Sequence, residues 1–403
     1  MKYAVLVGDG MSDSPVEQLG GKTPLEAANT ANMDSIARDG KAGLLRTIPP
    51  GFGPDSYVGH LTLFGYDPNI YFSGRSSVEA ANIGVELGEK DISFRCNLVT
   101  IVNDIMEDFS AGHIETEEAK ELIETLQESL GGSGISFHVG TSYRHLLVVD
   151  TSELQDADAN KLRSLQCTPP HDISGKKMLS HLPRGEGSGL LRDLMEQAVG
   201  VLASHPTNIM RMAEGRKPAN WIWLWGQGWK PQMPSFAELY GVTGAVISAV
   251  DLVKGLAKCV GLDVVDVPGA TAYFDTNYIG KAEYGLRVLE KQDLVYIHVE
   301  APDEASHEGD PELKVKSIEQ FDDLVVGNVL RGMKRFDEWR VLVTPDHMTS
   351  LDTRTHAADE VPFAMAGTGV ESDLSQQYDE RTAAGSGLAF LEGQDLMAHF
   401  IKG

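Results

Sequence analysis

Cysteine, basic residues and long apolar runs are all scarce in this sequence. The three cysteines, Cys96, Cys167 and Cys259, are far apart and form no C-x-x-C pair. We therefore expect the cysteines to be small core residues of a protein in a reducing compartment, rather than parts of a disulfide framework or a zinc knot. No stretch approaches the roughly 18 consecutive apolar residues of a membrane-spanning helix, and the apolar run after Met1 is too short for a signal peptide. These absences predict a cytoplasmic protein.

The shortage of basic residues leaves a strongly acidic chain. Lys and Arg number 34 against 59 Asp and Glu, a net charge of −25. Such a surface repels nucleic acid and anionic membranes, which bind proteins through basic patches, so we expect neither as a partner. It also repels a phosphorylated substrate, unless cations or local arginines reverse the sign of the charge at the site. The composition leaves the oligomeric state unknown.

What is present is an alternation of apolar strands and helices. The chain has 403 residues, too many for one compact core, which favours two domains. Strand-like runs at 2–8, 294–299 and 340–344 are separated by helical patterns, among them a single amphipathic helix over 22–40 and a helix capped by Asp310. This order predicts an α/β fold with a doubly wound, mainly parallel sheet covered by helices on both faces.

The middle of the chain has a different pattern. Residues 137–150 read as a hairpin with its turn near Gly140, and the segment around it lacks the strand–helix alternation. We therefore expect a smaller α+β domain, residues 86–235, inserted into a discontinuous domain made of residues 1–85 and 236–403. Insertion is tolerated at a loop whose two ends lie close together.

Potential metal ligands follow three of the predicted strands within a few positions. Because the carboxyl ends of parallel strands meet at one edge of a sheet, residues far apart in sequence would converge there. Two of them are four residues apart, which puts both on one side of a helical turn. A further histidine ends the polar loop HMTSLDTRTH. The candidates are Asp9, Asp303, His307, Asp346, His347 and His356.

The chemistry of this set indicates more than one ion. Mixed carboxylate and imidazole ligands suit manganese, zinc or iron better than calcium. Three carboxylates and three imidazoles exceed the needs of one structural zinc, and two adjacent ions are used for in-line displacement at phosphorus. Taken singly, each residue is more often a helix cap or a satisfied histidine. Because such residues recur after several strands, a dinuclear site and these ordinary roles are about equally favoured.

Ser56 is the candidate nucleophile. It follows the Gly- and Pro-rich approach GFGPD and precedes an apolar, helix-like run from Val58. A serine at a helix N-terminus is most often a cap. The same position aims backbone N–H groups at an anion, so it also suits a serine that accepts a phosphoryl group.

Together these motifs resemble a known family. VGDGMSD, KTPLEAA, DSYVGHL, CNLVT, SAGHI, HVEAPDEASHEGD and TPDH occur in the order found in the 2,3-bisphosphoglycerate-independent phosphoglycerate mutases, and the chain is most similar to their archaeal-type branch, which bacteria also carry. HVEAPDEASHEGD is the most specific of these motifs. The resemblance covers the whole length and implies an alkaline phosphatase-like fold. It also implies metal-dependent interconversion of 3-phosphoglycerate and 2-phosphoglycerate, a step of glycolysis and gluconeogenesis, through a phosphoserine.

The resemblance also assigns roles to positions in this chain. It implies two divalent ions (manganese, zinc or magnesium), and a small phosphorylated acid as substrate. His113 of SAGHI resembles the acid/base histidine, and Arg95 and Arg144 are candidate substrate-binding cations because guanidinium pairs with carboxylate or phosphate. One departure is Tyr57, which follows Ser56 where an acidic residue is usual. The implied ligands are Asp303, His307 and His356 for one ion, and Asp9, Asp346, His347 and the Ser56 oxygen for the other.

Other functions compete with this interpretation. A kinase-like branch of the same family, proposed to phosphorylate homoserine, and a plain phosphatase would use similar residues. A dinucleotide-binding oxidoreductase is disfavoured because Asp13 stands where the fingerprint after Gly8 needs a small residue. A P-loop is absent. A non-catalytic metal-binding scaffold would need closed coordination and no nucleophile.

Overall fold

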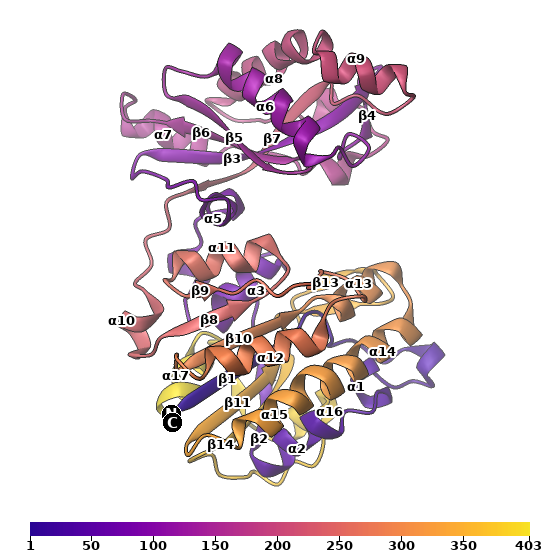
Figure 1. Ribbon diagram of the computed structural model, residues 1–403, viewed down its shortest axis with the longest axis vertical. Coiled ribbons are helices and arrows are strands. Elements are labelled where there is room, and N and C mark those ends of the chain that lie inside the picture. Colours follow the sequence, from indigo (N-terminus) through magenta and orange to yellow (C-terminus); the bar gives the residue numbers. More distant parts are fainter. The chain divides into compact units, whose positions relative to one another are not determined.

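The computed structural model describes residues 1–403 and divides into two compact units (Figure 1). The first unit contains Met1–Phe72 and Met233–Gly403, and the second contains Ser73–Gln232. The second unit begins at Ser73 rather than near residue 86, because helix α5 (Arg75–Asn82) packs on its sheet. The Ser76 hydroxyl of α5, for example, donates to the carbonyl of Ser93. None of the helices is both long enough and apolar enough to cross a membrane.

The first unit is built on one eight-stranded sheet. β1 is parallel to both of its neighbours, β10 and β11, and β14 alone runs against the strands beside it. The predicted α/β fold with a mainly parallel sheet is therefore confirmed. From edge to edge the strands are β15 (Ala389–Phe390), β2 (Lys41–Leu45), β14 (Val361–Gly367), β11 (Trp339–Thr344), β1 (Lys2–Gly8), β10 (Leu294–Val299), β8 (Gly244–Ile247) and β9 (Asp263–Val264).

Apolar side chains on both faces of the central strands explain the doubly wound arrangement. On one face Leu6 and Ile297 pack in a core covered by α2, α12 and α15, with α12 and α15 side by side (Figure 1). On the other face the ring of Tyr296 packs against Phe64, directly after α3, and Tyr3 packs against Phe400 of α17. The helices of this unit are α1 (Pro24–Ala27), α2 (Ala31–Asp39), α3 (Ser56–Leu63), α4 (Pro68–Tyr71), α10 (Phe236–Tyr240), α11 (Asp251–Cys259), α12 (Tyr278–Val288), α13 (Ala301–Glu308), α14 (Pro311–Gln320), α15 (Gly327–Met333), α16 (Glu380–Gly385) and α17 (Asp395–Lys402), with the short turns η1 (Glu17–Leu19) and η4 (Phe321–Val326, a π-helix).

The single helix predicted over 22–40 is wrong. The structure has two helices, α1 and α2, separated by an extended Ala28. The reason is tertiary. Asp322, on the π-helix η4, accepts hydrogen bonds from the backbone N–H groups of Asn32 and Met33, so it caps α2 from another part of the chain.

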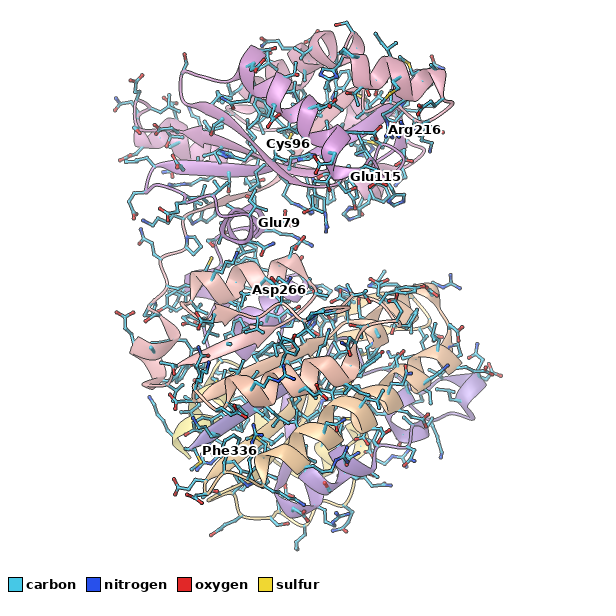
Figure 2. All side chains as sticks on the ribbon, viewed as in Figure 1. Glu79, Cys96, Glu115, Arg216, Asp266 and Phe336 are labelled. Carbon is cyan, nitrogen blue, oxygen red and sulfur yellow. The ribbon has the colours of Figure 1, made fainter.

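The inserted unit is an α+β domain, as predicted. Its five-stranded antiparallel sheet follows the order β4-β3-β6-β5, with β7 paired to the other side of β3. Cys96 of β3 (labelled in Figure 2) lies in a core with Leu122 of α6 and Leu194 of α8. The strands are β3 (Asp91–Val102), β4 (Ile105–Asp108), β5 (Ile135–Thr141), β6 (Arg144–Asp150) and β7 (Trp221–Trp229), and the other helices are α6 (Thr116–Leu130), α7 (Asp156–Arg163), α8 (Ser188–Ala203), α9 (Pro206–Ala213), η2 (Pro170–Ile173) and η3 (Met178–His181).

Candidate active site

The ends of three adjacent parallel strands bring distant polar residues together. Asp9 directly follows β1, and its N–H donates to the carbonyl of Val299 at the end of β10. Asp346 and His347 follow β11 on the other side of β1. His347 Nε2 lies 3.5 Å from Asp9 Oδ1 and 3.2 Å from Asp346 Oδ2. Strand order therefore places a cluster of Asp9, Asp346 and His347 at this edge of the sheet.

Ser56 faces this cluster from the first turn of α3. Its Oγ lies 3.2 Å from His347 Nε2. The N-cap of α3 is not Ser56 but Asp55, whose carboxylate accepts from the N–H of Tyr57 at 2.8 Å. Asp55 therefore has the capping role that a serine at a helix N-terminus most often takes. Gly59 lets α3 approach closely, because a Cβ there would come within 2.5 Å of the Asp346 carbonyl oxygen.

A second cluster adjoins the first through His347. Asp303 and His307 lie one turn apart on α13, and His307 Nε2 is 3.1 Å from Asp303 Oδ2. His356 comes from the hairpin β12 (Met348–Ser350) and β13 (Thr355–Ala357). Its Nε2 lies 3.4 Å from Asp303 Oδ1 and 3.0 Å from His307 Nε2, and its ring stacks on His347 at 3.8 Å.

The hydrogen bonds made by Nδ1 of His347 and His307 determine which ring nitrogen faces the two clusters. The Thr349 hydroxyl donates to Asp303 Oδ1 at 2.6 Å, so its oxygen accepts from His347 Nδ1–H at 3.1 Å. His307 Nδ1 donates to the Arg354 carbonyl oxygen at 2.9 Å. With Nδ1 donating, the neutral form of each ring carries its lone pair on Nε2, the atom that points into the site, as a metal-binding imidazole requires. In the structure His307 Nε2 faces Asp303, and the hydrogen bond to that carboxylate raises the pKa of His307 to about 9.

Burial and mutual repulsion strongly perturb the carboxylates. Burial, followed by the charges of Asp346 and Glu300, raises the pKa of Asp9 well above its usual range. Burial also acts to raise the pKa of Asp303, but hydrogen bonds from His307 and His356 outweigh it and hold that pKa well below its usual range. Asp9 is therefore stable as an anion only beside a further positive charge, whereas Asp303 is already stabilised as an anion by its two histidines.

The donor atoms of both clusters fit divalent cations. Asp9 Oδ1 and Asp346 Oδ2 are buried and form no hydrogen bond, although each is a strong acceptor. The Asp9–Asp346–His347 atoms lie within 4.8 Å of one another, and so do those of Asp303, His347 and His356. Buried acceptors without donors, together with inward lone pairs, are what a site for positive ions presents.

Comparisons with known proteins identify the family. A sequence model described as 2,3-bisphosphoglycerate-independent phosphoglycerate mutase matches residues 37–208. A relative of that name from Methanothrix thermoacetophila is 51% identical over 404 residues, covering 100% of both chains. The chain belongs to this family. A relative from Geobacter sulfurreducens, named a probable enzyme of the same kind, is 50% identical over 98% of each chain.

Solved structures of similar proteins share the fold over the whole chain. A Pyrococcus horikoshii protein superposes with a TM-score of 0.83 at 31% identity, covering 100% of this chain and 96% of its own. The cofactor-independent phosphoglycerate mutase of Thermoplasma acidophilum superposes with a TM-score of 0.67 at 27% identity, covering 100% and 99%. The two-unit architecture is therefore that of the phosphoglycerate mutase family.

The family resemblance in the inserted unit concerns Arg95, Arg144 and His113. Arg144 of β6 pairs in register with Asn97 of β3, and residues two apart on a strand share a face, so Arg95 and Arg144 lie on one side of the sheet. Arg95 Nε donates to Glu79 of α5 (labelled in Figure 2) at 2.9 Å, and its guanidinium lies 4.1 Å from the centre of the Trp225 ring.

The same unit places further cationic groups around Arg95. Burial lowers the pKa of Arg95 to about 10, and the charges of Arg75 and Arg144 act in the same direction, although Glu79 opposes them. His113 is exposed, in a left-handed conformation with φ 51°, and its ring lies 6.4 Å from that of Tyr143, beside Arg144. Arg75, Arg95 and Arg144 therefore lie near one another in the inserted unit, and Glu79 is paired with both Arg75 and Arg95.

The sequence motifs did not single out His60, His298 and Glu300. All three lie beside Asp9 or Asp346, and His298 Nε2 is 2.9 Å from Asp9 Oδ2. Burial raises the pKa of Glu300 to about 8. A signal was available, because His60 and His298 are polar residues inside the apolar runs YVGHLTLF and LVYIHV, and a polar residue in a buried run needs a partner.

Proposed function

We propose that this chain interconverts 3-phosphoglycerate and 2-phosphoglycerate by passing the phosphoryl group through Ser56. One observation carries the proposal. Ser56 Oγ stands at a helix N-terminus, 3.2 Å from a histidine nitrogen that also faces the unpartnered oxygens of Asp9 and Asp346. The names of full-length relatives supply the substrate class.

The ligands we propose for one divalent ion are Asp303, His307 and His356, and for the other Asp9, Asp346, His347 and the Ser56 oxygen. Manganese, zinc and magnesium remain the candidates. When bound, such ions supply positive charge that stabilises a deprotonated serine oxygen and the phosphoryl oxygens. The orphaned carboxylate oxygens and inward imidazole lone pairs support this assignment.

In the first half of the reaction Ser56 Oγ attacks the phosphorus of 3-phosphoglycerate. A serine–phosphorus bond forms, the bond to the substrate's C3 oxygen breaks, and that oxygen takes up a proton. The backbone N–H groups at the start of α3 are positioned to donate to the phosphoryl oxygens. The product of this half is glycerate with phosphoserine at position 56.

In the second half the glycerate reorients and its 2-hydroxyl attacks the phosphoserine. The proton leaves the 2-hydroxyl as the new phosphorus–oxygen bond forms, and Ser56 Oγ is released. We assign the proton transfers to His113 and the retention of glycerate to Arg95 and Arg144, whose guanidinium groups pair with carboxylates. Without such retention, water would hydrolyse the phosphoserine.

The direct test is Ser56→Ala, with Ser14→Ala, outside both clusters, as the matched control. Ser56→Ala should keep the fold and most metal binding but lose isomerisation, and mass spectrometry of a quenched wild-type reaction should find phosphate on the peptide that contains Ser56. Undiminished turnover in Ser56→Ala would falsify the proposal. If the intact protein instead transfers phosphate from ATP to homoserine without isomerising 3-phosphoglycerate, the kinase-like function is correct.

A further inference from the structure

Two buried histidines on the helix-α3 side of the sheet face the carboxylates of the candidate active site. His298 Nε2 lies 2.9 Å from Asp9 Oδ2, and His60 Nε2 lies 3.5 Å from Asp346 Oδ2. Both rings are almost fully buried, and their planes meet at 81° with centroids 4.8 Å apart. Neither histidine belongs to the two ligand sets proposed above.

Each histidine is backed by a hydroxyl that sets its tautomer. The Tyr296 hydroxyl lies 2.6 Å from His60 Nδ1 in the core, so its proton goes to that nitrogen. Ser248 Oγ already accepts from the N–H of Val250, and its own proton is directed to His298 Nδ1 at 3.0 Å. With Nδ1 accepting, each ring carries its hydrogen on Nε2, the atom that faces a carboxylate.

We infer that His60 and His298 are positioning residues that orient the carboxylates of Asp346 and Asp9 from outside the two ligand sets. His298 donates to Asp9 Oδ2, which leaves Asp9 Oδ1 facing His347. His60 directs its N–H toward Asp346 Oδ2, the oxygen that also faces His347. This inference rests on the proposed function. A neutral imidazole suits the task, since a lysine or arginine at the same place would repel the cation.

Each histidine thus lies between a hydroxyl and a carboxylate. The two series of side chains are Tyr296, His60 and Asp346, and Ser248, His298 and Asp9. Tyr296 and His298 are two residues apart on β10 and so share one face of the sheet, while His60 comes from α3, the helix that carries Ser56. One face thus holds the donors for two carboxylates that reach the site from two other strands. Such outer partners tune metal affinity by about 10–100-fold in metalloproteins.

The test compares divalent-metal dissociation constants, measured by competition with a chromophoric chelator, for matched variants. His298→Leu removes the donor. It should weaken the binding of one of two manganese ions by about 10–100-fold and lower kcat, with KM nearly unchanged. His298→Gln keeps an N–H donor at that place and should restore most of the affinity. Tyr296→Phe leaves every proposed ligand intact, yet should weaken metal binding, whereas Tyr278→Phe, which removes a buried phenol that has no hydrogen-bond partner, should not.

Several outcomes separate this inference from its rivals. Unchanged metal affinity in folded His298→Leu and Tyr296→Phe overturns it, and a merely structural role would appear as lower stability without that change. Asp9, His60 and His298 also lie close enough to hold an ion themselves. A third manganese equivalent in the wild type that is lost in His298→Leu would make the histidines ligands and overturn the inference. A wild type that binds fewer than two ions would instead refute the proposed function. If His298→Leu does not fold, Tyr296→Phe decides.

Discussion

The behaviour of single histidines in this chain depends on what each ring nitrogen faces. His307 and His347 are set with Nδ1 donating, whereas the hydroxyls behind His60 and His298 direct Nε2 to donate. His145 is a third case, in the inserted unit and away from any carboxylate. Its Nδ1 accepts from the N–H of Gly140 at 3.0 Å, and burial lowers its pKa to about 3.

His145 should make the protein sensitive to acid. Its folded pKa lies below the ordinary value of about 6.5, so the unfolded chain binds the proton more tightly, and stability falls as pH drops from 6.5 toward 3. His145→Asn keeps an acceptor for Gly140 and removes the titration. Urea unfolding at pH 6.5 and pH 5 should show a loss about 2 kcal/mol smaller in the variant. Equal losses would show that His145 is protonated alike in both states.

At the scale of elements, one lysine joins α14 to two segments of the active site. Lys314 Nζ is fully buried and donates to Asp13 Oδ2 at 2.9 Å and to the Thr349 carbonyl oxygen at 2.7 Å. Thr349 in turn holds Asp303 and His347 through its hydroxyl. The helix that begins after Asp310 is therefore linked to the geometry of both clusters.

Lys314→Met should destabilise the protein by about 3–5 kcal/mol, because it leaves the buried Asp13 carboxylate without its cation. Adding Asp13→Asn to the same chain should recover part of that loss. Arg287→Met is the control, since Arg287 and Glu283 form an exposed pair on α12 and its loss should cost less than about 1 kcal/mol. Chemical denaturation measures the free energy of unfolding of all three variants. A loss in Lys314→Met no larger than that in Arg287→Met would contradict the prediction.

At the scale of the whole molecule, charge is distributed unevenly, because an acidic chain carries a patch of three arginines, of which Arg75 and Arg95 share the carboxylate Glu79 as a partner. The net charge of −25 disfavours a phosphorylated acid, yet the inserted unit gathers Arg75, Arg95 and Arg144 near one another. We expect this patch to retain glycerate while the phosphoryl group is on Ser56, which distinguishes a mutase from a phosphatase.

Arg144→Ala should lower isomerisation and raise the share of free phosphate released. Loss of one charge-assisted hydrogen bond to the intermediate is worth about 1.5–3 kcal/mol, or roughly 10–100-fold in rate. Arg192→Ala on α8 is the control, because the Arg192 guanidinium is bonded to the Pro183 carbonyl oxygen. Phosphate release and 2-phosphoglycerate formation are measured side by side, and an unchanged ratio in Arg144→Ala would remove Arg144 from the proposed role.

Local patterns were sufficient to predict the framework. β1 and β10 have the bounds that their apolar runs predict, and α14 starts after Asp310 as its capping residues predict. The spacing of Asp303 and His307 places both on α13. These features depend on neighbours in sequence, where apolar periodicity and caps act, so the sequence alone determined them.

Only the tertiary structure decided the features that depend on distant partners. The predicted helix over 22–40 is broken because Asp322, almost 300 positions away, caps its second half. The tautomers of His60 and His298 likewise follow from contacts between residues far apart in the chain. A hydrogen bond between residues far apart has no local signature, because its energy depends on geometry that exists only once the sheet has assembled.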